Sequence, residues 1–315
     1  MMKKRSATAV LLGGALGVGI IGGLLPGPDR SLRADEPPEG FRALFDGKTL
    51  TGWTAKPRPQ AARPAAGGTP AKDLESFYER SLKSRGKWTV EKGVLIGGQD
   101  PPGSGLGGYL VSDEAFGDFE LLIDARPDWS VDTGVLVRTT PGGNVGYQIL
   151  IDHRRSGGIG GFYGNGLGGF HALAFNVAAV FDANGKPVGL REEDPRTSLA
   201  PVTEDKRRLL SYAATPEQFL KAWKFGEWNT FRIRCEGELP HLTTWINGVK
   251  IAELDTDKTP LPNFDKEAVR ARLGRRGHIS LEVHSNGPND KLGKDRWAPG
   301  AVCRWRHIYI KELRK

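Results

Sequence analysis

The sequence is poor in sulfur-containing residues, with two cysteines and two methionines among 315 residues. Two cysteines are too few for the disulfide framework of a small secreted domain or for a cysteine-rich zinc or iron–sulfur site. With 38% hydrophobic and 26% charged residues, the composition is typical neither of a disordered chain nor of a protein with many membrane spans. A folded domain with an apolar core is therefore expected.

Several catalytic motifs are also absent. The chain has no His-Glu-x-x-His zinc motif, no Gly-x-Ser-x-Gly nucleophile elbow and no Glu-x-Asp-x-x-Glu strand of the kind that retaining glucanases use. A Gly-x-Gly-x-x-Gly match at 164–169 lies within glycine-rich sequence, and no clean Rossmann strand precedes it. A dinucleotide site is thus not expected.

Residues 1–34 are typical of an export signal. A basic start at Lys3, Lys4 and Arg5 precedes an uncharged run from Ala7 to Leu25, and Ala34 is a small residue suited to cleavage. An uncleaved N-terminal anchor is the alternative, because the run nearly spans a bilayer. Either interpretation predicts a protein that works outside the cytoplasm, and cleavage would leave no stable membrane insertion.

The net charge of +8 is divided equally between this leader and the rest of the chain. The remaining basic residues form small clusters without the interleaved aromatic residues that stack on bases. Nucleic acid is therefore not an expected partner.

Short alternating segments and turns predict an antiparallel β-sandwich. In Phe119–Arg126 every second residue is apolar, as in a half-buried strand, and Asn247-Gly248 between two such runs is a strong type I′ hairpin signal. Glycine is abundant, with 43 residues, and there is no βαβ alternation. We expect one domain over 35–315, with loop insertions at 56–87, 183–224 and 257–277. Helices are expected over 71–84, 216–224 and 265–273.

Two strands carry the sharpest candidate site residues. In His278–His284 the apolar residues alternate with polar ones, so that Glu282 and His284 share one face. A carboxylate beside an imidazole can orient it, raise its basicity or share a metal with it, although a solvated ion pair would give the same pattern. In Gly146–His153, Gln148 and Asp152 alternate with apolar residues.

Further candidates have competing interpretations. Arg138 ends the strand before Gly146. His153 shares a face with isoleucines, so a buried histidine is as reasonable as a site residue. Eight glycines within 157–170 predict a tight loop at a ligand cleft, with Tyr163, Asn165 and His171 as its side chains. Trp245 or Trp297 could form a sugar-stacking platform, although core positions are the commoner use of tryptophan.

Cys235 and Cys303 both fall in predicted strands. In an exported protein a disulfide between them is the economical expectation, and two buried thiols are the alternative.

Ordered landmarks along the chain resemble one known family. They are LFDGKTLTGW at Leu44–Trp53, WTVEKGVL at Trp88–Leu95, WING at Trp245–Gly248, GHISLEVH at Gly277–His284 and WRHIYIKEL at Trp305–Leu313. Together they closely resemble the 3-keto-disaccharide hydrolase family, over nearly all of the chain from Gly40 to Leu313. The resemblance implies a concanavalin A-like jelly-roll β-sandwich with long loops and a few short helices, export, and action on 3-keto-glycosides.

The resemblance also carries over residue by residue. The family's Tyr-Glu-x-Gln strand falls on Tyr147–Leu150 and its aspartate on Asp152, while its Leu-Gln-x-His element falls on Leu281–His284. Its Arg-Asn-Ile falls on Arg306–Ile308, which adds Arg306 to the substrate-binding candidates. This chain departs from the family at Gln148, Glu282 and His307. The first two departures together keep one carboxylate in the expected cleft.

These observations predict an exported, periplasmic or extracellular enzyme that cleaves 3-keto-glycosides by elimination and hydration or by net hydrolysis. We expect His284 as base or metal ligand, Glu282 as its partner, and Arg138 to stabilise oxyanion charge. Asp152 and Gln148 would bind hydroxyls. No cofactor is required, but a divalent metal held by His284, Glu282 and Asp152 is compatible with the chemistry. The alternatives are a lectin-like carbohydrate-binding module and a cell-surface scaffold.

Overall fold

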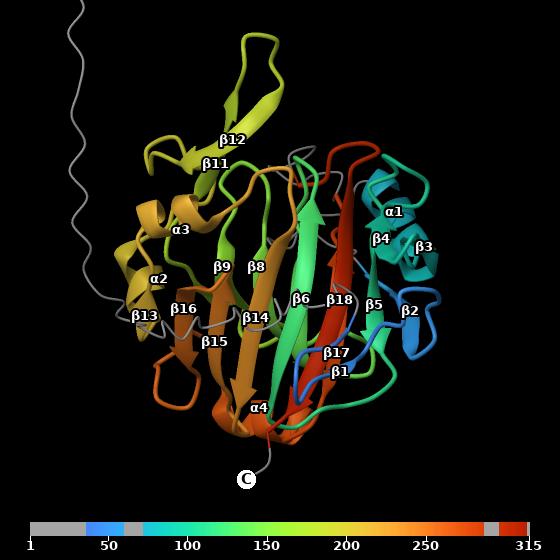
Figure 1. Cartoon of the computed structure of the whole chain (residues 1–315), viewed down its shortest axis with the longest axis vertical. Coiled ribbons are helices and arrows are strands. Elements are labelled where there is room, and N and C mark those ends of the chain that lie inside the picture. Colours follow the sequence, from blue (N-terminus) through green and yellow to red (C-terminus); the bar gives the residue numbers. More distant parts are fainter. Residues whose placement is uncertain (1–35, 60–71, 287–295, 314–315) are drawn as a thin grey trace, which may run out of the picture. The chain divides into compact units, whose positions relative to one another are not determined.

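Most of the described strands form two antiparallel sheets that pack face to face (Figure 1). The computed structural model describes residues 36–59, 72–286 and 296–313; the predicted leader at 1–34 lies outside them. Within the described residues, the larger sheet has nine strands and the smaller has seven. This arrangement confirms the predicted all-β jelly-roll sandwich. Pro37–Lys315 cluster as one unit.

The nine-stranded sheet faces the viewer in Figure 1. Eight strands follow one another in hydrogen-bonded order, and the ninth, β1, pairs with β18. In that order they are β13 (Tyr212–Ala213), β16 (Val249–Asp255), β15 (His241–Ile246), β14 (Asn229–Glu236), β6 (Phe119–Pro127), β18 (Val302–Glu312), β4 (Val94–Gly98) and β3 (Lys87–Glu91), with β1 at Arg42–Ala43.

The seven-stranded sheet lies behind it and carries the site described below. Its order is β10 (His171–Ala172), β9 (Ile159–Asn165), β8 (Gly146–Ile151), β7 (Gly134–Thr139), β17 (His278–Val283), β5 (Gly108–Ser112) and β2 (Trp53–Pro57). A separate hairpin of β11 (Val177–Phe181) and β12 (Pro187–Glu192) projects from the sandwich (Figure 1).

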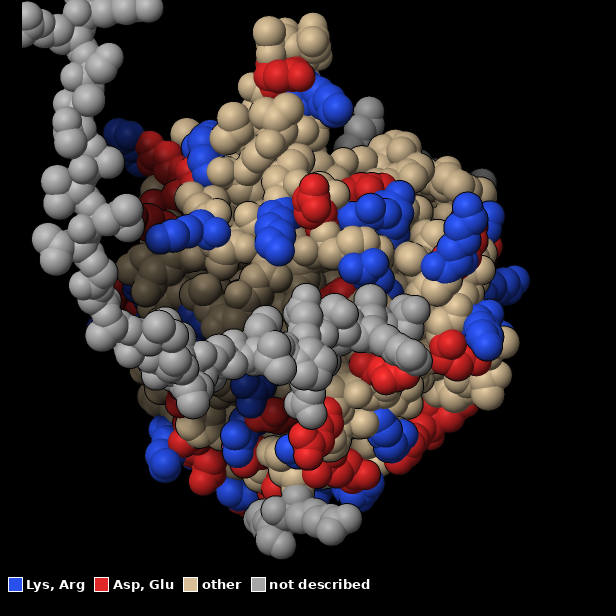
Figure 2. Space-filling view, viewed as in Figure 1, with Lys and Arg blue, Asp and Glu red and all other residues tan. Residues whose placement is uncertain are grey.

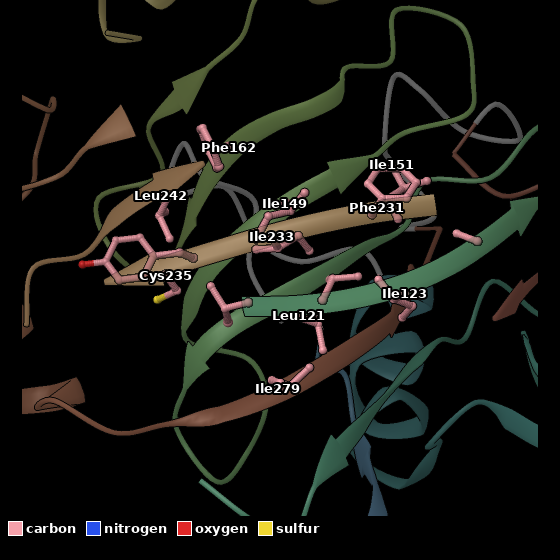
Figure 3. Close-up of a cluster of buried hydrophobic side chains, with 14 of the residues drawn as sticks. Leu121, Ile123, Ile149, Ile151, Phe162, Phe231, Ile233, Cys235, Leu242 and Ile279 are labelled. Atoms are coloured by element: carbon pink, nitrogen blue, oxygen red, sulfur yellow. The ribbon is translucent and has the colours of Figure 1, made fainter. Parts of the chain in front are cut away.

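Alternation along the strands builds the core between the sheets. The apolar residues predicted to face inward on β6, Phe119, Leu121, Ile123 and Ala125, are all fully buried. Figure 3 shows Leu121 and Ile123 beside Ile149 and other aliphatic side chains from strands of both sheets. Because side chains alternate between faces, the residues between these inward ones are directed to the outer surfaces.

Four short helices lie among the described residues: α1 (Lys72–Lys83), α2 (Glu204–Arg208), α3 (Pro216–Ala222) and α4 (Lys266–Leu273). The predicted helix around 216–224 is confirmed, with Thr215 as its N-cap in a capping box with Gln218. The predicted helices at 71–84 and 265–273 correspond to α1 and α4. Helix α2, a single polar turn, and the β11–β12 hairpin were not predicted.

The predicted Asn247-Gly248 hairpin is confirmed between β15 and β16. Both residues have positive φ angles, +49° and +83°, which a type I′ turn requires.

The outer face of the nine-stranded sheet carries interspersed charges of both signs (Figure 2). Glu120 pairs with Arg232 at 2.7 Å, and Asp124 pairs with Arg306 at 3.2 Å. Among the described residues no helix is long and apolar enough to cross a bilayer.

The two cysteines are buried free thiols, so the expected disulfide is wrong. Cys235 pairs in register with Phe119 and Cys303 with Pro127, at opposite ends of the same strand β6. Eight residues of strand separate those positions by roughly 26 Å at about 3.3 Å per residue, whereas a disulfide needs Cα atoms within about 7 Å.

Candidate functional site

A pocket of about 330 Å³ opens on the outer face of the seven-stranded sheet. Its volume lies at the lower end of the range for small-molecule sites. Strand β8 supplies Gln148 and Leu150, and β9 supplies Tyr163 and Asn165, because these positions alternate with core residues. In the sheet register Gln148 lies directly opposite Tyr163. The remaining lining residues come from strand ends and loops: Arg58, Asp132, Asp152, Arg154, His171, His284 and Arg296.

Glu282 lies beneath this pocket and does not line it. Its side chain is 1% exposed, and its two oxygens accept hydrogen bonds of 2.6 Å each from Arg58 Nε and Gln148 Nε2. Burial raises the pKa of Glu282 despite the neighbouring Arg58 guanidinium. The carboxylate therefore fixes two pocket-lining side chains from below.

Tyr109 of β5 also lies beneath the pocket, next to Glu282. It lies opposite Glu282 in the register of β5 and β17, and its ring lies beneath the Arg58 guanidinium at 5.9 Å. Asn165 donates a hydrogen bond of 3.3 Å to the Tyr109 hydroxyl. Arg58 and Asn165 are thus both held by groups below the pocket.

Two carboxyl groups, Asp132 and Asp152, meet at one side of the pocket and hydrogen-bond to each other. Arg154 contacts both, with Nε 3.1 Å from Asp132 Oδ2 and Nη2 3.4 Å from Asp152 Oδ2. Arg296 Nη1 lies 2.6 Å from the same oxygen of Asp132. Two buried carboxylates in contact cannot both ionise readily, so the pair shares a proton.

The surroundings decide which carboxyl keeps that proton. Burial and the neighbouring Asp132 raise the pKa of Asp152 well above its ordinary value. Burial alone would also raise the pKa of Asp132, but the surrounding positive charges, chiefly that of Arg154, outweigh burial and hold that pKa below the usual range. Asp152 Oδ1 is buried and has no hydrogen-bond partner, which adds to the cost of ionising this carboxyl group.

His284 contributes a neutral imidazole to the pocket. Its Nδ1 lies 2.6 Å from the Ser285 carbonyl oxygen, which can only accept, so Nδ1 carries the hydrogen. Nε2 then accepts from Arg296 Nη1 at 3.2 Å. Burial and the Arg58 guanidinium lower the pKa of His284 well below its ordinary value. The ring is therefore a poor proton acceptor in this arrangement.

The predicted pairing of Glu282 with His284 is wrong. The residues are two positions apart, but Glu282 is taken up by Arg58 and Gln148, while the Ser285 carbonyl orients His284. His284 also lies just beyond the end of β17 at Val283, so strict strand alternation does not reach it.

Five predicted site residues do line the pocket beside His284: Gln148, Asp152, Tyr163, Asn165 and His171. The last comes from β10, and its ring lies 4.5 Å from that of Tyr163, centroid to centroid. The prediction that the glycine-rich segment 157–170 borders a pocket therefore agrees with its position.

Arg138 lies away from the pocket, which corrects its predicted role. Its φ of +53° interrupts the strand alternation, and its side chain is fully buried. The guanidinium donates to the carbonyls of Arg275 and Gly237 and lies 3.5 Å from Asp118. Because it is enclosed by the protein's own acceptors, it cannot contact a substrate in the pocket.

His153 lies outside this pocket, away from the other predicted site residues, and borders a separate cavity of about 580 Å³. It is 1% exposed and packs against the rings of Trp129, Trp223 and Phe225, with centroids 5.1–5.6 Å away. Nδ1 lies 2.9 Å from the Asp128 carbonyl oxygen, and burial lowers the pKa of His153 to about 4.

Three other candidates also lie elsewhere. Trp245 belongs to β15 of the other sheet, where Arg232 stacks on its ring at 4.9 Å. Arg306 of β18 pairs with Asp124 and stacks on Trp228 at 4.3 Å. Trp297 is 1% exposed and cannot serve as a platform.

Four residues that line the pocket were not predicted from the sequence: Arg58, Asp132, Arg154 and Arg296. Arg58 lies in the predicted loop insertion 56–87, and the other three lie in irregular segments between strands. In the sequence these residues are isolated charges next to buried strands. That pattern occurs too often in proteins to indicate a site.

The pocket's donor set does not fit a divalent metal. Each proposed ligand is already directed at a guanidinium: Glu282 at Arg58, Asp152 at Arg154 and His284 at Arg296. Within 36–59, 72–286 and 296–313, no group of three His, Cys, Asp or Glu side chains could hold an ion.

A family model described as a 3-keto-alpha-glucoside-1,2-lyase-like domain matches residues 40–311. Among curated protein sequences, none matches this chain.

Solved structures with similar folds are distant. A candidate glycosyl hydrolase from Parabacteroides distasonis is 16% identical, with a TM-score of 0.42, covering 88% of this chain and 95% of that one. The carbohydrate-binding module CBM66 from Bacillus subtilis is 9% identical, with a TM-score of 0.38, covering 72% and 92%.

Proposed function

The chain belongs to the 3-keto-alpha-glucoside-1,2-lyase-like family, and we propose that it cleaves 3-keto-glycosides in the pocket on the seven-stranded sheet. Membership makes it a carbohydrate-active protein. The observation that carries the reaction is the Asp132–Asp152 pair, in which one buried carboxyl with a raised pKa lines a pocket of sugar size.

The chemistry follows from the ketone. A carbonyl at C3 acidifies the hydrogen on C2, so a base can remove it and form an enolate. The enolate electrons then expel the substituent at C1 with its bonding pair, leaving a double bond between C1 and C2. Addition of water to that bond would complete a net hydrolysis.

Asp152 is the proposed base, and it acts in its ionised form, after the proton shared with Asp132 has left. A base works best when its pKa is near the working pH, and Asp152 is moved toward that range by burial and Asp132. His284 was the first candidate from the sequence. Its lowered pKa and the Arg296 donor at Nε2 make it better suited to orienting the substrate or Arg296.

The arginines would stabilise the negative charge that develops on the C3 oxygen. Arg58, Arg154 and Arg296 all line the pocket, and each is held by a carboxylate. Donors fixed before the reaction stabilise a developing oxyanion without reorganisation. Gln148, Tyr163 and Asn165 supply neutral donors and acceptors for sugar hydroxyls.

A lectin-like module on the same sandwich is the competing function. Sugar-binding modules use exposed aromatic platforms, whereas this pocket concentrates buried charged groups with shifted pKa values. The cluster of buried charged groups therefore favours an enzyme over a sugar-binding module.

The test is incubation of the purified protein with a 3-keto-disaccharide, with and without a chelator, while products are followed by chromatography. We expect cleavage at an equal rate in both samples, because the donor set does not fit a metal. Sugar binding without turnover would overturn the proposal in favour of the module, and loss of activity in chelator would overturn the metal-free mechanism.

Export is part of the same proposal and rests on the sequence of residues 1–34. Mass spectrometry of the protein expressed with its full sequence should find a chain beginning at Asp35 outside the cytoplasm. An intact Met1 on cytoplasmic protein would contradict it.

A further inference from the structure

A second cavity of about 590 Å³ adjoins the pocket. His171 lines both cavities. The charges of Lys206, in the second cavity, and of Asp132 and Arg154, in the first, all act on the His171 ring. The two cavities therefore meet at this residue.

Two of the predicted loop insertions build the walls of the second cavity. From 183–224, helix α2 contacts β10, and the Leu173 amide donates to the Lys206 carbonyl at 3.4 Å. From 257–277, Pro260 and Pro262 form the opposite wall. The sandwich alone would leave this side of the pocket open.

The second wall is anchored firmly. The ring of Phe264 packs against Phe170 at 5.8 Å and against Tyr147 at 6.3 Å. Gly168 lies so close to Asn263 that an added Cβ would meet its carbonyl oxygen at 2.3 Å. Only glycine permits this approach, and the φ of +89° at Gly168 favours it as well.

The chemistry of this cavity differs from that of the pocket. Phe170, Leu209, Pro260 and Pro262 present apolar side chains without hydrogen-bonding groups. The charged residues are engaged with the protein, since Lys206 donates to the Pro201 carbonyl at 2.7 Å and Arg208 pairs with Asp205. A second sugar ring would leave hydroxyls unpaired against the four apolar residues, whereas a flat apolar group would bury its surface against them.

We infer that this cavity is a leaving-group subsite and that the preferred substrates are 3-keto-glycosides of flat, apolar aglycones such as phenols. The inference rests on the proposed function. When the bond from C1 to the aglycone oxygen breaks, the electron pair stays on that oxygen, which takes a proton from water. A phenol, with a pKa of about 10, accepts that charge more readily than a sugar alcohol.

The test compares phenyl, methyl and glucosyl 3-keto-glucosides with wild-type enzyme and with Leu209→Glu. A carboxylate in the apolar wall should lower kcat/KM for the phenyl substrate about tenfold or more, and for the methyl substrate less than about twofold. Leu82→Glu, on an exposed leucine of α1 outside both cavities, is the matched control. Because Leu209 also packs against the core, Pro262→Glu at an exposed position is a second variant that does not depend on core packing.

Equal losses on phenyl and methyl substrates in both variants, or no loss on either, would overturn the inference. A loss on the glucosyl substrate as large as that on the phenyl one would show a sugar subsite instead. If wild-type enzyme cleaves none of the three, the proposed function fails. The subsite is then judged by ligand-observed NMR with phenyl glucoside: binding weakened by Leu209→Glu and not by Leu82→Glu upholds it, and no binding to wild type refutes it.

Discussion

Replacing Asp152 by asparagine removes the proposed base while leaving its contacts in place. Asparagine has nearly the same shape, its Oδ1 can accept from Arg154 as Asp152 Oδ2 does at 3.4 Å, and its Nδ2 can donate to Asp132 in place of the shared proton. The buried group also no longer has to ionise. We therefore expect the folded protein to be as stable as wild type.

The expected loss of activity can be bounded. General acid–base catalysis by a positioned side chain contributes about 10²- to 10⁴-fold to a rate, or roughly 3–5.5 kcal/mol of barrier. Since Asp152 must be ionised to accept a proton, the wild-type rate should rise with pH through its raised pKa. That acidic limb should lie well above the ordinary aspartate value of about 3.9.

The assay is the pH dependence of kcat/KM on a 3-keto-glycoside, with thermal unfolding as the check on folding. Asp152→Asn should lower kcat/KM and should also abolish its rise with pH on the acidic side of the profile. Asp132→Asn removes the charge that raises the Asp152 pKa, so its remaining activity should show a limb at lower pH. A folded Asp152→Asn enzyme with more than about a tenth of the wild-type rate, or a limb that Asp132→Asn does not move, would refute the assignment.

Three further predictions concern groups outside the acid pair. Glu282→Gln should cost about 3 kcal/mol in urea unfolding and lower turnover of 3-keto-glycosides, because Arg58 loses its buried counter-charge. His153 binds a proton below about pH 4 when folded but below about 6.5 when unfolded, so stability should fall by up to about 3 kcal/mol as pH drops between these values. His153→Phe should remove that part of the pH dependence without loss of activity at pH 7. Cys235 and Cys303 should react with a thiol reagent only after denaturation, as two thiols per chain.

Each of these has a clear contrary result. Full activity with a stability change below about 0.5 kcal/mol in Glu282→Gln would show that Arg58 does not depend on this carboxylate. An unchanged pH dependence in His153→Phe would place the titrating group elsewhere. Absence of reactive thiols in denaturant without reductant would indicate a disulfide.

Local patterns predicted those parts of the molecule that depend on neighbouring residues. The alternation in β6 and β8 identified the core face and directed Gln148 outward, whereas Asp152 lies just beyond the end of β8. The helix N-cap at Thr215 and the Asn247-Gly248 turn could also be predicted from the sequence. Both depend on hydrogen bonds or backbone angles of residues that are close together in the chain. Alternation failed at Arg138, where a positive φ turns the side chain into the core.

The sequence by itself determined the all-β fold, the family and part of one face of the pocket, because strand periodicity and local motifs encode them. Only the tertiary structure decided which charges meet. It set Glu282 under Arg58, joined Asp132 to Asp152, and directed Arg296 at His284. These partners lie up to 224 residues apart. A pKa depends on burial and on the charges around a group, and both exist only once the sheets and loops have packed together.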